Sequence, residues 1–437
     1  MNRRLWENLA SLYSVHIASY VIPLFTLPYL ARVLRPAEWG SLAFAEAYSL
    51  YMTLIVEFGF GLSATREVAR VRGDAQARGR QLSGVLGAQM MLGVAALLVT
   101  AALARTLPIF AAHGNLLPGA LLLGLSRAVN PTWYFQGIER MRIMSLLNIT
   151  ANAAAAAGIF VLVGSPGDGW IALVLRGGAA LACTVAGLSI VYRDTPFLWP
   201  SFRRSWEALR QGSSLFLLKS SVTLYTTANV LILGMLAAPA MIAWYAGAEK
   251  IAKAAVSGIG PMAQAFYPRI NHLFASDRDR AAETLRASAW LMMGVGIAAG
   301  LALFAGAPIL VRLLLGRGFE RSIPVLRVLA VLPPMISASN LFGIQWMLPL
   351  RMDREFNAIV LLAGLLNVGL AMVAARRYGP MGMAVSVVCA ETFVTAGTVF
   401  ALWRRHLDPW RSVAAPRREP AVPEIFDQAV AGVQSYE

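Results

Sequence analysis

Charge and cysteine are both scarce in this sequence. Only 14% of its 437 residues are charged and 57% are hydrophobic, and the mean hydropathy is +0.59. A soluble chain of this length needs far more polar surface, because soluble cores stop growing at roughly 250 to 300 residues. The two cysteines, Cys183 and Cys389, lie in separate apolar runs, which excludes a disulfide framework and a CxxC metal or redox site. The composition predicts an all-α polytopic membrane protein.

Enzyme signatures are missing as well. The sequence has no GxxxxGK[ST], HExxH or GxSxG motif and no cluster of cysteine and histidine, which argues against a P-loop, a zinc protease and a serine-hydrolase elbow. We therefore expect a transporter rather than an enzyme, with no metal site and no cofactor. Arg3 and Arg4 precede the first apolar segment without a small-residue cleavage site, so this segment is predicted to stay in the membrane.

Long apolar segments fill most of the chain. A helix needs about 20 residues to cross the hydrocarbon. Twelve segments are predicted to cross it, near residues 8–31, 38–62, 81–104, 115–136, 144–164, 169–192, 212–237, 240–268, 286–316, 322–350, 356–376 and 381–403. Lys and Arg concentrate in the connections after even-numbered segments, and retention of positive charge in the cytoplasm then places both termini there. The net charge of +15 is thus explained by topology and does not indicate nucleic-acid binding.

Two basic connections, residues 65–74 and 268–280, occupy matching positions six segments apart. The two halves of the chain would therefore share one orientation and be related by a pseudo-two-fold axis along the membrane normal. We predict two six-helix bundles, residues 1–200 and 201–403, followed by a polar cytoplasmic tail at residues 404–437.

Charged residues inside the apolar segments are the candidate functional groups. A charge at the bilayer centre costs at least about 2.5 to 3.5 kcal/mol, so it usually faces a bundle interior or a wet cavity. Lys250 and Lys253 share a helix face, and Glu249 lies four residues before Lys253. Arg127 and Lys219 lie on polar stripes of two other segments. These cations predict a chamber for an anionic substrate such as a phosphate or pyrophosphate.

Simple ion pairing is the alternative interpretation of these charges. Glu46, Glu57, Glu249 and Glu391 also lie in apolar segments and could neutralise most of the cations. His16, in the first segment, has two interpretations too. Its ordinary pKa range suits proton coupling, but a hydrogen-bonded packing histidine is the commoner case.

Five motifs occur in order along the chain: PYLARVL at 28–34, EFGFGLSATR at 57–66, PTWYFQGIE at 131–139, AGAEKI at 246–251 and QAFYPR at 264–269. With them the chain resembles the Wzx-type polysaccharide flippases, which belong to the multidrug/oligosaccharidyl-lipid/polysaccharide exporter superfamily. The resemblance extends over nearly all of residues 1–403, and the WYFQGIE element is its most specific part. Arg35 is a departure, because the family commonly has glycine there.

This resemblance implies twelve helices in two bundles around a V-shaped chamber that opens to each side of the membrane in turn. It implies that an undecaprenyl-pyrophosphate-linked oligosaccharide is flipped from the cytoplasmic to the periplasmic leaflet of the bacterial inner membrane, for O-antigen or exopolysaccharide synthesis. The implied partners are this lipid, the membrane lipids, a polysaccharide polymerase and glycosyltransferases. Directional transport also needs a driving force, for which a proton or sodium gradient is the candidate.

The resemblance also implies roles for individual residues. The cationic chamber would consist of Arg32, Arg127, Lys219, Lys250 and Lys253. Arg66 and Arg269, at the cytoplasmic ends of two motifs, would guide lipid head groups or gate the inner mouth. His16 and Glu249 are the candidates for ion coupling.

Three rival functions fit parts of the sequence. A drug antiporter of the same superfamily would have an acidic chamber rather than a cationic one. A membrane glycan polymerase would need a long periplasmic loop, and the predicted outer connections are short. A flippase for the peptidoglycan precursor is disfavoured by the motifs but stays open.

Overall fold

A computed structural model describes the backbone of residues 3–407. Side chains are described from residue 25 onward, apart from those at 214–215, 217–219, 221–226, 275 and 278–279. The described chain consists of helices joined by short turns, with no strand. The helices of the first part are α1 (Arg3–Glu57), α2 (Phe60–Arg70), α3 (Ala75–Thr106), α4 (Pro108–Ala112), α5 (Leu117–Ala128), α6 (Thr132–Gly137), α7 (Met141–Leu162), the 3-10 turn η1 (Pro166–Asp168) and α8 (Gly169–Asp194). Those of the second part are α9 (Phe202–Leu236), α10 (Pro239–Val256), α11 (Ile259–Ser276), α12 (Arg278–Leu314), α13 (Ser322–Leu329), α14 (Leu332–Ser339), the π-helical η2 (Asn340–Met347) and α15 (Asp353–Arg404).

The two longest helices, α1 and α15, are each divided by one residue with positive φ. In α1 this residue is Arg35, with φ 60° and ψ 168°. In α15 it is Gly379, with φ 56° and ψ −130°. The two helices have 55 and 52 residues, more than twice the length that one crossing requires. Each therefore contains two of the predicted segments, 8–31 with 38–62 and 356–376 with 381–403.

Seven stretches of the described residues are long and apolar enough to cross a membrane. They are 25–70, 75–106, 141–162, 166–194, 280–314, 322–347 and 353–404. The predicted segments near 115–136, 212–237 and 240–268 are not among them. The chain is thus an all-α polytopic membrane protein, and the count of twelve crossings stays a prediction.

Local sequence explains two of these three differences. The segment near 115–136 is divided between α5 and α6, because Pro131 has no N–H to continue the hydrogen-bond ladder. The segment near 240–268 is divided at Ser257 and Gly258 for the same reason, since Pro261 follows in the first turn of α11. That segment also carries Glu249, Lys250 and Lys253, which lower its hydropathy. The segment near 212–237 falls largely on side chains outside the described residues.

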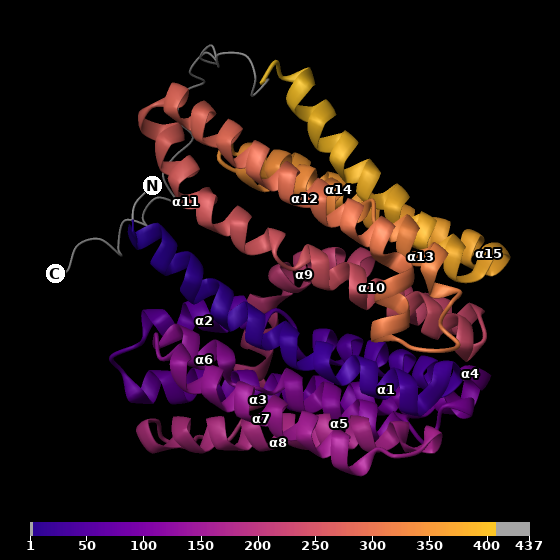
Figure 1. Cartoon of the computed structure of the whole chain (residues 1–437). Coiled ribbons are helices and arrows are strands. Elements are labelled where there is room, and N and C mark those ends of the chain that lie inside the picture. Colours follow the sequence, from indigo (N-terminus) through magenta and orange to yellow (C-terminus); the bar gives the residue numbers. More distant parts are fainter. Residues whose placement is uncertain (1–2, 408–437) are drawn as a thin grey trace.

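Figure 1 shows the helices in two groups, with α1–α8 below and α10–α15 above. Helix α1 packs against α5 in its own group and against α10 of the other. At Gly40 of α1 an added Cβ would lie 1.8 Å from the carbonyl oxygen of Pro239, so the two backbones touch where α10 begins. One hydrophobic core extends across this contact and includes Trp39, Phe44 and Tyr245.

Helix α9 belongs to both groups. Its first turns pack against α3, where a Cβ at Gly84 would lie 3.0 Å from the carbonyl oxygen of Arg204. Its last turns pack against α15, where Asn367 Nδ2 donates to Asn229 Oδ1 at 2.8 Å. The division predicted at residue 200 therefore falls just before a helix that links the groups. The assignment of two six-helix bundles stays a prediction.

The basic connection at residues 65–74 ends in a helix cap. The Asp74 carboxylate accepts hydrogen bonds from the backbone N–H groups of Ala77 and Gln76 at the start of α3. These bonds lower the pKa of Asp74, the bond from Ala77 most strongly. The connection thus positions α2 and α3 relative to one another.

Candidate functional site

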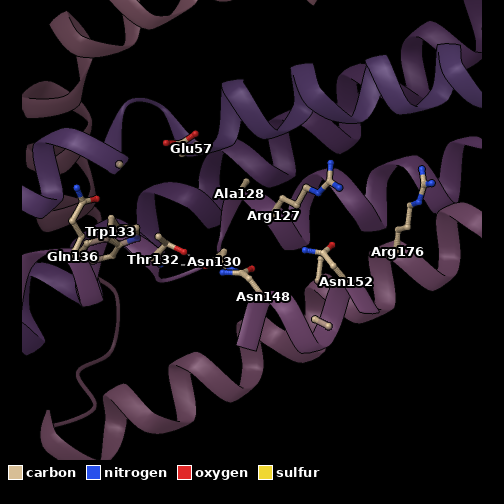
Figure 2. A pocket seen from close by; sticks show the side chains of 13 residues that line it. Glu57, Arg127, Ala128, Asn130, Thr132, Trp133, Gln136, Asn148, Asn152 and Arg176 are labelled. Atoms are coloured by element: carbon tan, nitrogen blue, oxygen red, sulfur yellow. Dashed lines mark hydrogen bonds between the residues drawn. The ribbon is translucent and has the colours of Figure 1, made fainter. Parts of the chain in front are cut away.

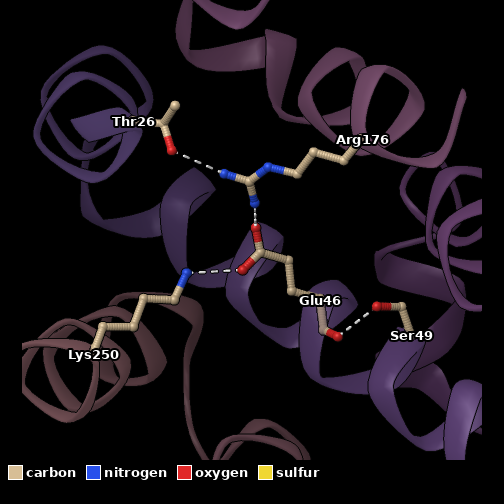
Figure 3. Close-up of polar contacts among 5 residues, drawn as sticks. All are labelled: Thr26, Glu46, Ser49, Arg176 and Lys250. Carbon is tan, nitrogen blue, oxygen red and sulfur yellow. Dashed lines mark hydrogen bonds and ion pairs between the residues drawn. The ribbon is translucent and has the colours of Figure 1, made fainter. Parts of the chain in front are cut away.

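The centre of the candidate site is a carboxylate held between two cations. Glu46 in α1 accepts hydrogen bonds from Arg176 of α8 and from Lys250 Nζ of α10, the latter at 2.8 Å (Figure 3). Arg176 also donates to Thr26 Oγ1 at 3.3 Å. Lys250 Nζ lies 5.0 Å from the ring centre of Trp39, within cation–π distance. One carboxylate thus connects helices of both groups.

A cavity of about 300 Å³ opens beside this junction. Its polar wall contains four cationic side chains, those of Arg127, Arg176, Lys250 and Lys253, and the single carboxylate of Glu46. Its apolar wall is formed by Leu27, Leu30, Trp39, Leu50, Leu123, Ala155, Ala156, Ile159 and Ala254. The cavity therefore has a positive polar side and an apolar side.

Arg127 is the cation of this cavity that has no close acidic partner. Its guanidinium forms no salt bridge with any described residue. The carboxylate of Glu46, which is already bonded to Arg176 and Lys250, is the acidic group that attracts it electrostatically. An unpaired guanidinium can accept two oxygens of a phosphate in one plane. Arg127 is consequently the group most available to an anionic ligand.

A second cavity of about 300 Å³ adjoins the first and shares Arg127, Asn152 and Arg176 with it. Figure 2 shows its wall, which comes mainly from α5, α6, α7 and α8, with the end of α1 and the start of α2. Amide side chains dominate this wall: Asn130, Gln136, Asn148 and Asn152. Trp133 and Glu57 also line it. Amides suit hydroxyl-rich ligands because they both donate and accept hydrogen bonds, and an indole ring offers an apolar face and one N–H donor.

Lys253 is partly neutralised, as the pairing hypothesis predicted. Its Nζ lies 3.2 Å from Glu249 Oε1, and Tyr245 donates to the same oxygen at 3.1 Å. Lys250 is paired too, but with Glu46 of α1 rather than with a residue of its own helix. Both hypotheses describe part of the site: Lys250 and Lys253 are paired, yet the cations outnumber the carboxylates of the cavity.

Arg32 does not line either cavity. Its Nη2 donates to the carbonyl oxygen of Leu313 in the last turn of α12 at 2.7 Å. This bond closes an unsatisfied helix C-terminus and links the first part of the chain to the second. The chamber role of Arg32, implied by the resemblance, therefore stays a prediction that its contacts do not favour.

The other residues singled out from the sequence lie away from the cavities or outside the described part. Arg66 is exposed in α2, with its Nε 3.4 Å from Glu67 Oε1. Arg269 is exposed in α11. The side chains of His16 and Lys219 are outside the described residues.

Three members of the site were not among the residues predicted to bind substrate: Arg176, Glu46 and Asn152. Arg176 and Glu46 were both detectable as charges inside apolar segments. Asn152 is a lone amide in an alanine-rich run of α7, and that pattern alone does not distinguish a cavity wall from packing.

Comparison with known proteins supports one family. Residues 5–274 match the family described as polysaccharide biosynthesis protein. A protein of Escherichia coli (strain K12) named "Putative O-antigen transporter" is 30% identical over 395 residues, which cover 89% of this chain and 94% of that protein. A protein of Shigella dysenteriae with the same name is 27% identical over 394 residues, covering 89% of this chain and 97% of that one.

Solved structures show the same fold at lower identity. An inward-facing multidrug resistance MATE family transporter of the MOP superfamily gives a TM-score of 0.69 at 16% identity, covering 88% of this chain and 94% of that one. Lipid II flippase MurJ, in an inward closed conformation, gives 0.71 at 12% identity, covering 90% and 87%. The fold, the matched residues and the identity to the named transporters agree with the flippase motifs. The chain therefore belongs to the polysaccharide biosynthesis protein family, among the Wzx-type flippases of the exporter superfamily that its motifs resemble.

Proposed function

We propose that this protein flips an undecaprenyl-pyrophosphate-linked oligosaccharide from the cytoplasmic to the periplasmic leaflet of the bacterial inner membrane. Its family and the names of its relatives support a membrane transporter, not an enzyme, and a role in moving polysaccharide or lipid-linked precursors. The class of glycan, the leaflet order and the cytoplasmic location of both termini belong to the proposal.

The charge balance of the cavity beside Glu46 carries this proposal. Four cations face one carboxylate there, so the cavity keeps a positive excess after Glu46 is neutralised. A pyrophosphate group would meet Arg127 directly and would compete with Glu46 for Arg176 and Lys250. The cavity thereby lowers the cost of moving a diphosphate through the apolar interior.

The adjoining cavity is proposed to hold the first sugars. Its four amides line the same cavity as Arg127, so a sugar attached to the pyrophosphate would reach them without leaving the two cavities. The lipid tail would stay in the bilayer. The remaining repeat unit would extend into the water-filled part of the chamber.

Transport requires the site to open to each side in turn. The Glu46–Lys250 contact joins α1 to α10, and the bond from Arg32 joins α1 to α12. We propose that these contacts between the two parts of the chain break and re-form as the site opens outward. A proton or sodium gradient would supply the energy, with Glu249 and His16 as the candidate coupling groups and no cofactor.

The function is tested by deleting the gene in its host and locating the lipid-linked glycan. We expect an unpolymerised repeat unit to accumulate where an added periplasmic glycan-cleaving enzyme cannot reach it. Re-expression of the wild type should restore access and surface glycan. Normal surface glycan in the deletion strain, with altered sensitivity to cationic drugs, would instead identify a drug antiporter.

A further inference from the structure

A separate pocket of about 580 Å³ lies where three breaks in the second half of the chain meet. The turn between α9 and α10 contributes Ala237 and Ala238 to its wall, the first turns of α10 contribute Met241 and Trp244, and the N-cap of α13 contributes Arg321. The break of α15 at Gly379 contributes Arg376, Arg377 and Tyr378. Neither cavity of the candidate site shares a residue with this pocket.

Three arginines converge on this pocket from segments more than fifty residues apart in the sequence. None of the three forms a salt bridge with a described residue, and no carboxylate lines the pocket. Arg321 Cζ lies 4.7 Å from the ring centre of Trp244, which holds that guanidinium against an aromatic face. Trp244 in turn donates from Nε1 to the carbonyl oxygen of Gly318 at 2.9 Å. Arg321 is therefore held in place, and no acidic side chain among the described residues neutralises the cluster.

The rest of the wall is apolar. Leu236, Val325 and Met381 line the pocket beside the arginines. Tyr378 is 62% exposed at its edge. A ligand with an anionic head and an apolar body can pair with the arginines and also cover the apolar wall. A free sugar has neither a charge for the arginines nor an apolar chain for the wall.

The position of the pocket makes the arginines unexpected. The bend of α15 lies at the end of the molecule opposite the first residues of α1 and the last residues of α15 (Figure 1). With both termini in the cytoplasm, this end faces the periplasm. Short outer connections normally carry few cations, yet two adjacent arginines and a third occur here and gather in one pocket.

We propose that this pocket binds the phosphorylated head group of a lipid in the outer leaflet. Guanidinium groups bind phosphate oxygens in pairs, and basic pockets between membrane helices bind anionic lipid head groups. The shared chemistry is a phosphate or pyrophosphate on an apolar chain. Its source is either an anionic phospholipid or the flipped lipid itself. Both alternatives take the orientation of the chain from the proposed function, and only the second also takes the flipped substrate from it.

Site-specific photocrosslinking in native membranes tests this proposal. Tyr378 is replaced with p-benzoylphenylalanine, and the captured lipids are identified by mass spectrometry. The matched control carries the same photoreactive residue at Val373, which is 72% exposed on α15 and does not line the pocket. We expect lipids with net anionic head groups to be enriched over phosphatidylethanolamine at position 378 relative to position 373.

Substitution of the arginines makes the test specific. R376Q/R377Q should lower the captured anionic lipid at least about ten-fold, because it removes two guanidinium groups that form charge-assisted hydrogen bonds to phosphate. R376K/R377K should restore part of it. R312Q/R317Q removes two exposed arginines outside the pocket and should change nothing.

The identity of the captured lipid distinguishes the sources. Phosphatidylglycerol or a related phospholipid would indicate a bound membrane lipid, also in a strain that makes no glycan. A lipid pyrophosphate, lost in that strain, would indicate the flipped product. Equal lipid compositions at positions 378 and 373, unaffected by R376Q/R377Q, would overturn the proposal. The flippase function is tested separately, by locating the lipid-linked glycan in the deletion strain. One proposal can therefore fail while the other holds.

Discussion

Glu46, which is partly buried, and Glu391, which is buried, are acids in opposite halves of the chain, and their surroundings differ. Glu46 is bonded to Arg176 and Lys250 and lines the cationic cavity. Glu391 in α15 accepts a hydrogen bond from Ser339 Oγ at 2.6 Å and forms no salt bridge with a described residue. The first acid organises several charges, whereas the second is held by one hydroxyl. The difference indicates that the polar chemistry of the site is concentrated around α1, with α10 supplying lysines from the other half.

The helix breaks show the same asymmetry. Gly379 divides α15 and adopts its positive φ at no steric cost. Arg35 divides α1 with φ 60° and ψ 168°, a region that is essentially restricted to glycine. The break in α1 therefore stores backbone strain, whereas the break in α15 does not.

The largest expected effect is that of Glu46→Gln. This change leaves Arg176 and Lys250 close together without their shared carboxylate, and in a partly buried cluster we expect this to cost somewhat less than the roughly 3 kcal/mol of a fully buried pair. We expect a lower unfolding temperature in detergent and loss of flipping. Glu391→Gln is the matched control in the other half and should change the unfolding temperature little, because an amide oxygen still accepts from Ser339. Equal effects of the two substitutions would contradict the comparison.

Arg127→Gln should affect transport more than stability. Arg127 has no salt bridge with a described residue to lose, yet it lines both cavities. We expect flipping to fall about ten-fold, the value of one charge-assisted phosphate contact, with membrane insertion intact and the unfolding temperature near that of the wild type. Arg203→Gln, at an exposed arginine of α9, serves as the control. Unfolding of the Arg127 variant would show that this residue is structural.

Ser339→Ala tests how Glu391 is held. It removes the described donor to the buried carboxylate, and an unsatisfied buried acceptor costs about 1 to 3 kcal/mol. We expect an intermediate loss of stability by thermal unfolding. The combination with Glu391→Leu should cost less than the sum of the two single changes, because the bond can be lost only once. Strict additivity would show that the bond contributes nothing.

Arg35→Gly should have the smallest effect, with the opposite sign. Glycine relieves the strain at positive φ but adds conformational freedom to the unfolded chain, so the net gain should be at most about 1 kcal/mol. Thermal unfolding measures it. The same substitution at exposed Arg354, in the first turn of α15, should destabilise instead. A loss of stability at position 35 would show that the Arg35 side chain makes a compensating contact.

The sequence predicted the class of fold and the positive charge of the site better than it predicted the contacts between the site residues. Composition and hydropathy indicated an all-α membrane protein, because apolar surface on this scale cannot be buried in one soluble core. The motifs around Trp133 and Glu249 placed the family. Intramembrane charge identified Arg127, Lys250 and Lys253 as cavity residues.

Pairings between distant segments could not be predicted. Glu46 bonds to Arg176 and Lys250 because of the way α1, α8 and α10 pack. The periodicity of a single helix does not reveal how it packs against distant helices. Arg32 lies in a motif but bonds to the end of α12, because a free helix C-terminus lies beside it. The break at Ser257 and Gly258 divides the apolar segment near 240–268, which hydropathy alone predicted as one continuous helix.

Flipping of the lipid-linked oligosaccharide by purified protein in liposomes tests the central claim most directly. The wild type, Lys250→Ala, Arg127→Ala and the exposed control Arg203→Gln are reconstituted in parallel, and the fraction of lipid glycan that reaches the outer leaflet is measured. We predict that the two cavity variants insert normally and flip at least about ten-fold more slowly, while Arg203→Gln flips like the wild type. Wild-type rates in both cavity variants would contradict the assignment of the cation-lined cavity as the transport site.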